Sequence, residues 1–228
     1  MLTQSLIELL IAALLFSGGH FVLSGPHLRA RLVRVFGEPR FLALYSVLML
    51  ISFGWMIVSF LRTPVEIVWD APAWSRGFAL GVMPVAFILL AGALRPDNPT
   101  AIGTLGAKRQ RSVPGFFAIT RHPFLWAVTL WSVAHLIANG DIASIVLFGS
   151  LLVLALFGTV AIDTKRQRRD PLRWRQLAAT TSNLPFAAII AGRAKFPPRA
   201  LLWPGALGLA LYVVFLAGHR WLFGVSPL

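Results

Sequence analysis

The sequence predicts an all-α protein: a polytopic membrane bundle of about six transmembrane helices, in a single domain over residues 1–228. Three observations support this prediction. Hydrophobic residues make up 57% of the chain and the mean hydropathy is +0.75, whereas soluble domains are usually below about 50% apolar. Several apolar runs reach the length of a membrane span. The basic residues gather in alternate loops between these runs.

Six apolar segments can cross a hydrocarbon core of roughly 30 Å at about 1.5 Å per residue, the third and fourth only just. Because a backbone in lipid must satisfy its own hydrogen bonds, each segment is expected to be a helix. The predicted spans cover residues 2–23, 41–61, 77–94, 123–138, 142–162 and 201–223. The first is expected to be a retained span rather than a cleaved signal, because no basic stretch precedes it.

The net charge of +13 is distributed unevenly over the predicted loops. Loops one, three and five carry 18 of the 21 basic residues. Loops rich in Lys and Arg stay in the cytoplasm, which places both termini on the opposite, periplasmic side. The same rule accounts for the charge without nucleic acid, the first partner to consider for a soluble chain this basic. No nucleic-acid binding is therefore predicted.

Two loops contain further patterns. In the fifth loop, residues 163–199, the segment KRQRRDPLRWR is a cationic patch suited to the anionic head groups of a lipid bilayer. SNLPFAAIIAGR follows it and is apolar but too short to span, which predicts an interfacial or re-entrant segment. In the second loop, WDAPAW at residues 69–74 is typical of an aromatic belt at the membrane interface.

Ionisable side chains within spans are costly and mark candidate functional sites. Counted along the helices, His20 in the first span and His135 in the fourth lie at comparable depth, near the middle of the bilayer. The other three histidines are expected near the membrane surfaces: His27, His122 and His219. Trp131, His135 and Asn139 recur every four residues and share a stripe, which is expected to face the bundle interior.

Two neutral imidazoles on separate helices at matched depth suit axial ligation of haem b, one on each face of the ring. Arg121 and His122 would receive the propionates at the cytoplasmic edge. Four aromatic residues would supply apolar walls: Phe16, Phe21, Trp126 and Trp131. The alternative is that His20 and His135 only fix helix packing through hydrogen bonds. The chain has no cysteine, which excludes disulfides, thiolate ligands and cysteine nucleophiles.

Several motifs together resemble the NnrU family over nearly the first 165 residues. They are GGH at 18–20, RARLV at 29–33, WDAPAW, RHP at 121–123 and LWSVAHLIANGD at 130–141. The resemblance implies a bacterial inner-membrane protein associated with denitrification. The family is similar to the plant zeta-carotene isomerase, a haem b enzyme that isomerises a cis double bond. This resemblance implies that the ligand histidines of that enzyme correspond to His20 and His135. A cysteine of the isomerase corresponds to Ser132, so thiolate exchange has no counterpart here.

The function implied by this resemblance is haem-dependent isomerisation or redox chemistry on a lipophilic small molecule reached from the bilayer. One alternative is a non-enzymatic membrane factor that supports maturation of denitrification or respiratory enzymes. The RHP motif also resembles the isoprenylcysteine carboxyl methyltransferase-like enzymes, which use S-adenosylmethionine at the cytoplasmic face. Their acidic, tyrosine-rich cofactor segment has no counterpart after the fifth span, which makes that alternative distant.

Overall fold

The computed structural model describes residues 3–100 and 115–228, and there the regular structure is helical apart from one isolated bridge between Ile67 and Asp141. Five helices in these ranges are long and apolar enough to cross a membrane: Gln4–Ser24, Glu38–Arg62, Ser75–Ala93, Ile142–Arg169 and Pro198–Phe223. The predicted all-α, multi-pass class is confirmed. Residue 2 of the first predicted span and three basic residues of the third loop lie outside the described residues: Lys108, Arg109 and Arg111.

The fourth predicted span is a shorter helix than the others. It forms α6, Pro123–Asn139, whose 17 residues extend about 25 Å, less than a hydrocarbon core of roughly 30 Å. Pro123 begins the helix, and Gly140 follows it with φ of 72°. The next helix, α7, Ile142–Arg169, continues past the predicted end at residue 162, so Asp163 lies on a helix rather than in a loop.

The chain forms two compact units. The first comprises Met1–Pro72 with His135–Leu154, and the second comprises Ala73–Ala134 with Ala155–Leu228. Both α6 and α7 therefore contribute residues to each unit.

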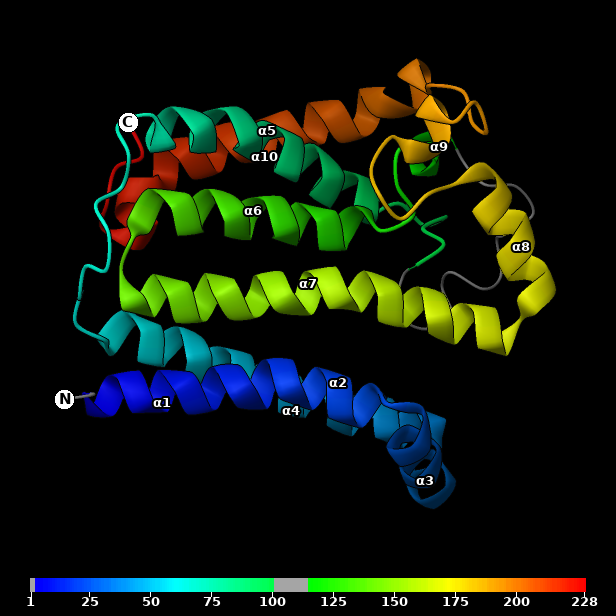
Figure 1. Ribbon diagram of the computed structural model, residues 1–228, viewed down its shortest axis with the longest axis horizontal. Helices are drawn as coiled ribbons and strands as arrows, with labels where there is room; N and C mark the ends of the chain where they lie inside the picture. Colours follow the sequence, from blue (N-terminus) through cyan, green and yellow to red (C-terminus); the bar gives the residue numbers. More distant parts are fainter. Residues whose placement is uncertain (1–2, 101–114) are drawn as a thin grey trace. The chain divides into compact units, whose positions relative to one another are not determined.

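In the first unit, α1, Gln4–Ala13, and α2, Gly19–Ser24, follow each other along the first span (Figure 1). A π-helical turn η1, Leu14–Gly18, joins them. Thr3 caps the start of α1, since the Thr3 hydroxyl accepts a hydrogen bond from the Leu6 amide. Two further helices follow: α3, Pro26–Phe36, and α4, Glu38–Arg62, which packs along α1. Gly25, followed by Pro26 at the first position of α3, and Gly37, with a positive φ, separate the three helices.

The second loop is hydrogen-bonded to the turn between α6 and α7. The amides of Val68 and Trp69 both donate to the Gly140 carbonyl, at 2.9 and 3.2 Å. A Cβ atom at Gly140 would lie 2.2 Å from the Trp69 carbonyl oxygen, so only glycine fits this position. Trp69, the first residue of the predicted aromatic belt, therefore helps to hold this turn in place.

In the second unit, α5, Ser75–Ala93, packs against α10, Pro198–Phe223. The Tyr212 hydroxyl donates to the Leu80 carbonyl, and a Cβ atom at Gly208 would lie 2.6 Å from the Cα of Ile88. The fifth loop contains two short helices: α8, Pro171–Thr180, which begins in the cationic patch, and α9, Ala187–Ile190, which lies in the predicted interfacial segment. A short turn η3, Gly115–Ala118, contributes to the apolar core of this unit, which consists of Leu89, Phe116, Phe117, Ile119 and Ala127.

Candidate functional site

His20 lies in the first unit, two residues beyond the π-helical turn. Its Nδ1 lies 2.7 Å from the Phe16 carbonyl oxygen. Because a carbonyl only accepts, Nδ1 carries the proton in the neutral ring and Nε2 carries the lone pair. A π-helical turn inside an α-helix is often found at a functional position. The local fold thus produces the histidine tautomer that a metal ligand requires at Nε2.

Aromatic side chains border the His20 imidazole. The ring centroids of Phe16 and Tyr45 lie 4.6 and 5.6 Å from it, both edge-on. Phe16 also packs on Phe53 at 5.1 Å. Of the aromatic walls expected from the sequence, Phe16 therefore lies beside His20, and α4 supplies Tyr45 and Phe53, which the sequence did not identify.

His135 is half-buried, and its ring stacks on Phe148 of α7 with centroids 4.8 Å apart and an interplanar angle of 29°. Phe148 in turn meets the edge of Phe60 on α4. Asn139, the last residue of α6, is exposed, because the helix ends at Gly140. The expectation that the whole stripe faces the interior is therefore wrong at Asn139, although Trp131 and His135 are each half-buried.

Both predicted haem ligands belong to the first unit, and α7 contacts the segment that bears each of them. Ser17, one turn before His20, donates to the Ser150 carbonyl at 3.3 Å, while His135 stacks on Phe148. Positions 148 and 150 are about 200° apart around a helix, so α7 uses different sides for the two contacts. The two imidazoles consequently have different immediate neighbours in this structure.

Ser132 precedes His135 by one turn of α6 and is fully buried. Its hydroxyl oxygen has no hydrogen-bond partner within residues 3–100 and 115–228. The same ranges contain no group of three or more His, Cys, Asp or Glu side chains that could hold a metal ion.

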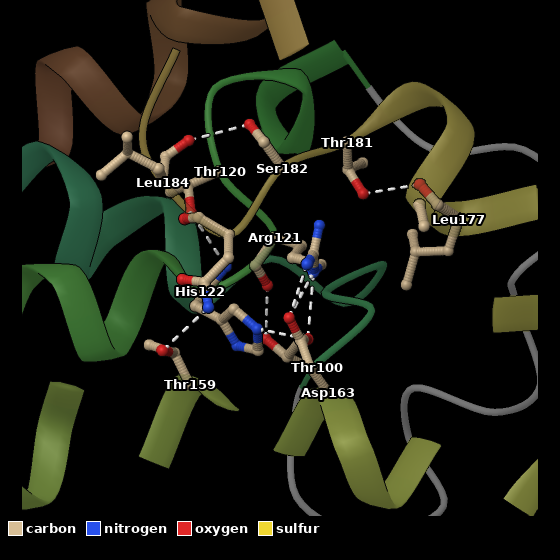
Figure 2. A network of polar contacts seen from close by, with 12 residues as sticks. Thr100, Thr120, Arg121, His122, Thr159, Asp163, Leu177, Thr181, Ser182 and Leu184 are labelled. Carbon is tan, nitrogen blue, oxygen red and sulfur yellow. Dashed lines mark hydrogen bonds and ion pairs between the residues drawn. The ribbon is translucent and has the colours of Figure 1, made fainter. Parts of the chain in front are cut away.

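Arg121 and His122 belong to the second unit, where both point at Asp163 of α7 (Figure 2). The Arg121 Nε lies 3.0 and 3.1 Å from the two carboxylate oxygens, and the His122 Nε2 lies 2.7 Å from Oδ1. The Arg121 guanidinium also lies over the Trp174 ring, 4.8 Å from its centroid. A haem propionate at Arg121 would have to compete with this carboxylate, which the sequence-based prediction did not foresee.

The His122 side chain is completely buried, at 0% exposed. Since the Asp163 carboxylate only accepts, Nε2 of His122 donates to it. Burial lowers the pKa of His122 below the ordinary histidine value, against the raising effect of the Asp163 charge. His122 is therefore a neutral imidazole at neutral pH.

The segment after α8 is hydrogen-bonded to residues at the start of α6 and on α7. The Asn183 carbonyl accepts from the Thr120 hydroxyl at 2.7 Å and from the Trp126 indole at 2.8 Å. The Asn183 amide donates to the Thr159 hydroxyl, and the Arg121 amide donates to the Ser182 carbonyl. The predicted interfacial segment thus packs against the RHP motif.

Sequence reasoning missed Asp163 and Asn183 as site residues, because both were assigned to a loop. The order of the predicted spans contained a signal that could have identified Asp163. Consecutive spans run antiparallel, so the start of the fourth span and the end of the fifth lie at the same membrane surface. An acid at the end of one span opposite an Arg-His pair at the start of the other is a candidate ion pair.

Comparison with known proteins shows similarity along nearly the whole chain. The profile of the family described as NnrU protein matches residues 8–227. The 15-cis-zeta-carotene isomerase, chloroplastic, of Zea mays is 35% identical over 83 residues, which are 36% of this chain and 23% of the maize protein. The chain thus matches less than a quarter of that relative's length, and no solved structure matches it. Since the family profile covers residues 8–227, including nearly all of both compact units, the chain belongs to the NnrU family.

Proposed function

We propose that this protein binds haem b through His20 and His135 and uses it for isomerisation or redox chemistry on an apolar substrate reached from the bilayer. The observation that carries the proposal is the hydrogen bond from His20 Nδ1 to the Phe16 carbonyl, which leaves the Nε2 lone pair for a ligand. Family membership and the similarity to an isomerase support the reaction class. Haem b would supply a one-electron redox centre within the bilayer.

The residues around the two histidines fit a flat apolar group. Phe16, Tyr45 and Phe148 present rings to the imidazoles, and aromatic walls suit a porphyrin. Gly18 and Gly19 precede His20, and a Cβ atom at Gly19 would lie 3.0 Å from the Met49 methyl group, so the small residue permits close approach of α4 at this point. In this proposal His20 and His135 orient the group, while the aromatic residues exclude water from it.

The decisive experiment is an absorption spectrum of the detergent-purified protein in ferric and ferrous forms, after expression with ample haem. We expect a Soret band that is lost in His20→Ala and in His135→Ala. His27→Ala and His219→Ala serve as controls and should keep it, since His27 is exposed and His219 bonds to the Val225 carbonyl.

Two further results would decide against the ligand assignment. A colourless wild-type protein would contradict haem binding, and a Soret band that persists in both alanine variants would contradict the choice of histidines. If an alanine variant does not fold, His20→Met and His135→Met retain a haem ligand of different field strength. Each should then bind haem with a shifted spectrum.

A non-enzymatic role in maturation of denitrification or respiratory enzymes is the competing function. A deletion strain distinguishes the two. The enzyme proposal requires accumulation of a lipophilic substrate, whereas a maturation factor requires loss of activity in a separate respiratory enzyme without such accumulation.

We infer that the protein resides in a bacterial inner membrane with its basic loops in the cytoplasm, where they contact anionic head groups. Exposed arginines on α8 and at the end of α7 support this inference: Arg168, Arg169, Arg173 and Arg175. Leu172, between them, is 73% exposed, as expected for a helix whose apolar side chains enter the head-group region.

A further inference from the structure

His122 contains a buried nitrogen that the haem proposal does not use. Its Nδ1 has no hydrogen-bond partner in the part of the chain that the structure describes. With Nε2 donating to Asp163 at 2.7 Å, Nδ1 carries the lone pair of the neutral ring and can only accept. Leaving a buried acceptor unpaired is unfavourable, and native proteins usually satisfy such groups with water or a ligand.

The nearby donors within this network are already committed to other acceptors (Figure 2). The Thr120 hydroxyl donates to the Asn183 carbonyl and itself accepts from the His122 amide at 3.2 Å. The Thr100 hydroxyl donates to the Arg121 carbonyl at 2.6 Å. These contacts hold the backbone of residues 120–122 but leave the His122 lone pair to a donor from outside the network.

The orientation of the His122 ring is held by two other residues. Asp163 fixes the imidazole through Oδ1, and Arg121 fixes the plane of the carboxylate by bonding both of its oxygens. The pKa of His122, lowered by burial, keeps the ring neutral at neutral pH. A neutral imidazole held by a carboxylate is a good acceptor for a hydrogen bond or a proton.

We propose that His122 Nδ1 is a second binding site of this protein, separate from the His20 and His135 pair, which accepts a hydrogen bond from an O–H group that none of the described residues supplies. The donor is either a buried water molecule or the hydroxyl group of a lipophilic molecule. Asp163 and Arg121 are positioning residues for this site. The site does not depend on haem.

Nitrogen NMR of the full-length protein in detergent micelles, with ¹⁵N-labelled histidine, tests the proposal. His122→Gln identifies the His122 resonances by their loss. At neutral pH we expect a protonated Nε2 and a non-protonated Nδ1 whose resonance is displaced from the bare lone-pair position in the direction of hydrogen-bond acceptance. A bare Nδ1 resonance, or a protonated Nδ1, would overturn the proposal.

Exhaustive delipidation distinguishes the two sources of the donor. If a lipophilic hydroxyl occupies the site, its removal shifts the Nδ1 resonance to the bare position, and mass spectrometry of the extract identifies the molecule. If water occupies the site, the displaced resonance survives delipidation.

Asp163→Asn tests the positioning role. Oδ2 receives both Nε and Nη2 of Arg121, so the Asn oxygen is expected to take that place and turn its NH₂ group toward His122. The His122 ring must then change tautomer, and the non-protonated nitrogen becomes Nε2. Asp170→Asn is the matched control, since Asp170 caps α8 at an exposed position and should leave the His122 spectrum unchanged. An unchanged tautomer in Asp163→Asn contradicts the role of Asp163, and the wild-type spectrum remains decisive if this variant does not fold.

Discussion

The Asp163 carboxylate accepts hydrogen bonds from two neighbouring side chains of the RHP motif. It receives Arg121 and His122, adjacent in sequence but different in chemistry, and its side chain is only 13% exposed. Removing one partner of a buried pair costs far more than removing one partner of an exposed pair, because the remaining charge keeps its desolvation cost.

We therefore expect Arg121→Ala to lower the free energy of unfolding by about 3–5 kcal/mol. Arg173→Ala is the matched control: Arg173 pairs with Asp170 at 3.5 Å, with side chains 64% and 45% exposed, and should cost less than about 1 kcal/mol. Denaturant unfolding in detergent, followed by tryptophan fluorescence, measures both. Equal effects in the two variants would show that the Arg121 pair is not buried in the way described.

His122 makes stability depend on pH. Its pKa in the folded protein is lowered, so unfolded chains, with a histidine pKa of about 6.5, take up the proton first as the pH falls. The stabilising contribution is thus complete above about pH 6.5 and is lost as the pH drops through the folded pKa. We expect the thermal unfolding midpoint to decrease as the pH is lowered from 7.5 to 5. In His122→Gln this decrease should be smaller. His27→Gln, at an exposed position, should not alter it, and an equal slope in His122→Gln would contradict the prediction.

At the scale of elements, the apolar pattern located the helices well and their terminal turns less well. The third predicted span, 77–94, is Ser75–Ala93, and the second, 41–61, is Glu38–Arg62. The pattern did not indicate the π-helical turn before His20 or the helix α3 within the first loop. A π-turn retains the helical course and leaves no signal in the hydropathy, and α3 is too rich in arginine to stand out as an apolar run.

Packing of α5 on α10 depends on one glycine. A Cβ atom at Gly208 would lie 2.6–2.8 Å from backbone atoms of Phe87 and Ile88, which cannot move aside as a flexible side chain can. We expect Gly208→Ala to lower the thermal unfolding midpoint, at a cost of about 1–3 kcal/mol, as for overpacking in a core. Gly205→Ala, less than one turn earlier on α10, meets nothing within 4 Å and should be neutral or slightly stabilising. The reverse order of the two variants would contradict this packing.

At the scale of the whole molecule, the number of crossings decides on which side each terminus lies. The five long helices together with α6 give six crossings and put both ends on one side, whereas five crossings would separate the ends. Because α6 is only 17 residues long, its length alone does not decide between the two. The distribution of charge over the loops favours six.

The absence of native cysteine permits a clean test of this topology. We expect Gln4→Cys and Ser226→Cys to react with a membrane-impermeant maleimide added to the periplasmic side. Arg175→Cys on α8 should react only after the membrane is permeabilised. Labelling at only one of the two termini would show an odd number of crossings and would exclude α6 as a span.

Hydropathy and charge by themselves determined the fold class, the position of the helices and the histidines worth examining. This follows because lipid offers no hydrogen bonds to a backbone, so every apolar run of sufficient length must be helical. The tertiary structure alone decided which side chains meet. Arg121 and Asp163 are 42 residues apart, and Asn183 reaches Thr120 across 63 residues. Such pairs depend on how each helix is rotated and on the path of a loop, and the periodicity of the sequence encodes neither. For this reason His122, expected at an open membrane edge, is a buried partner of a carboxylate.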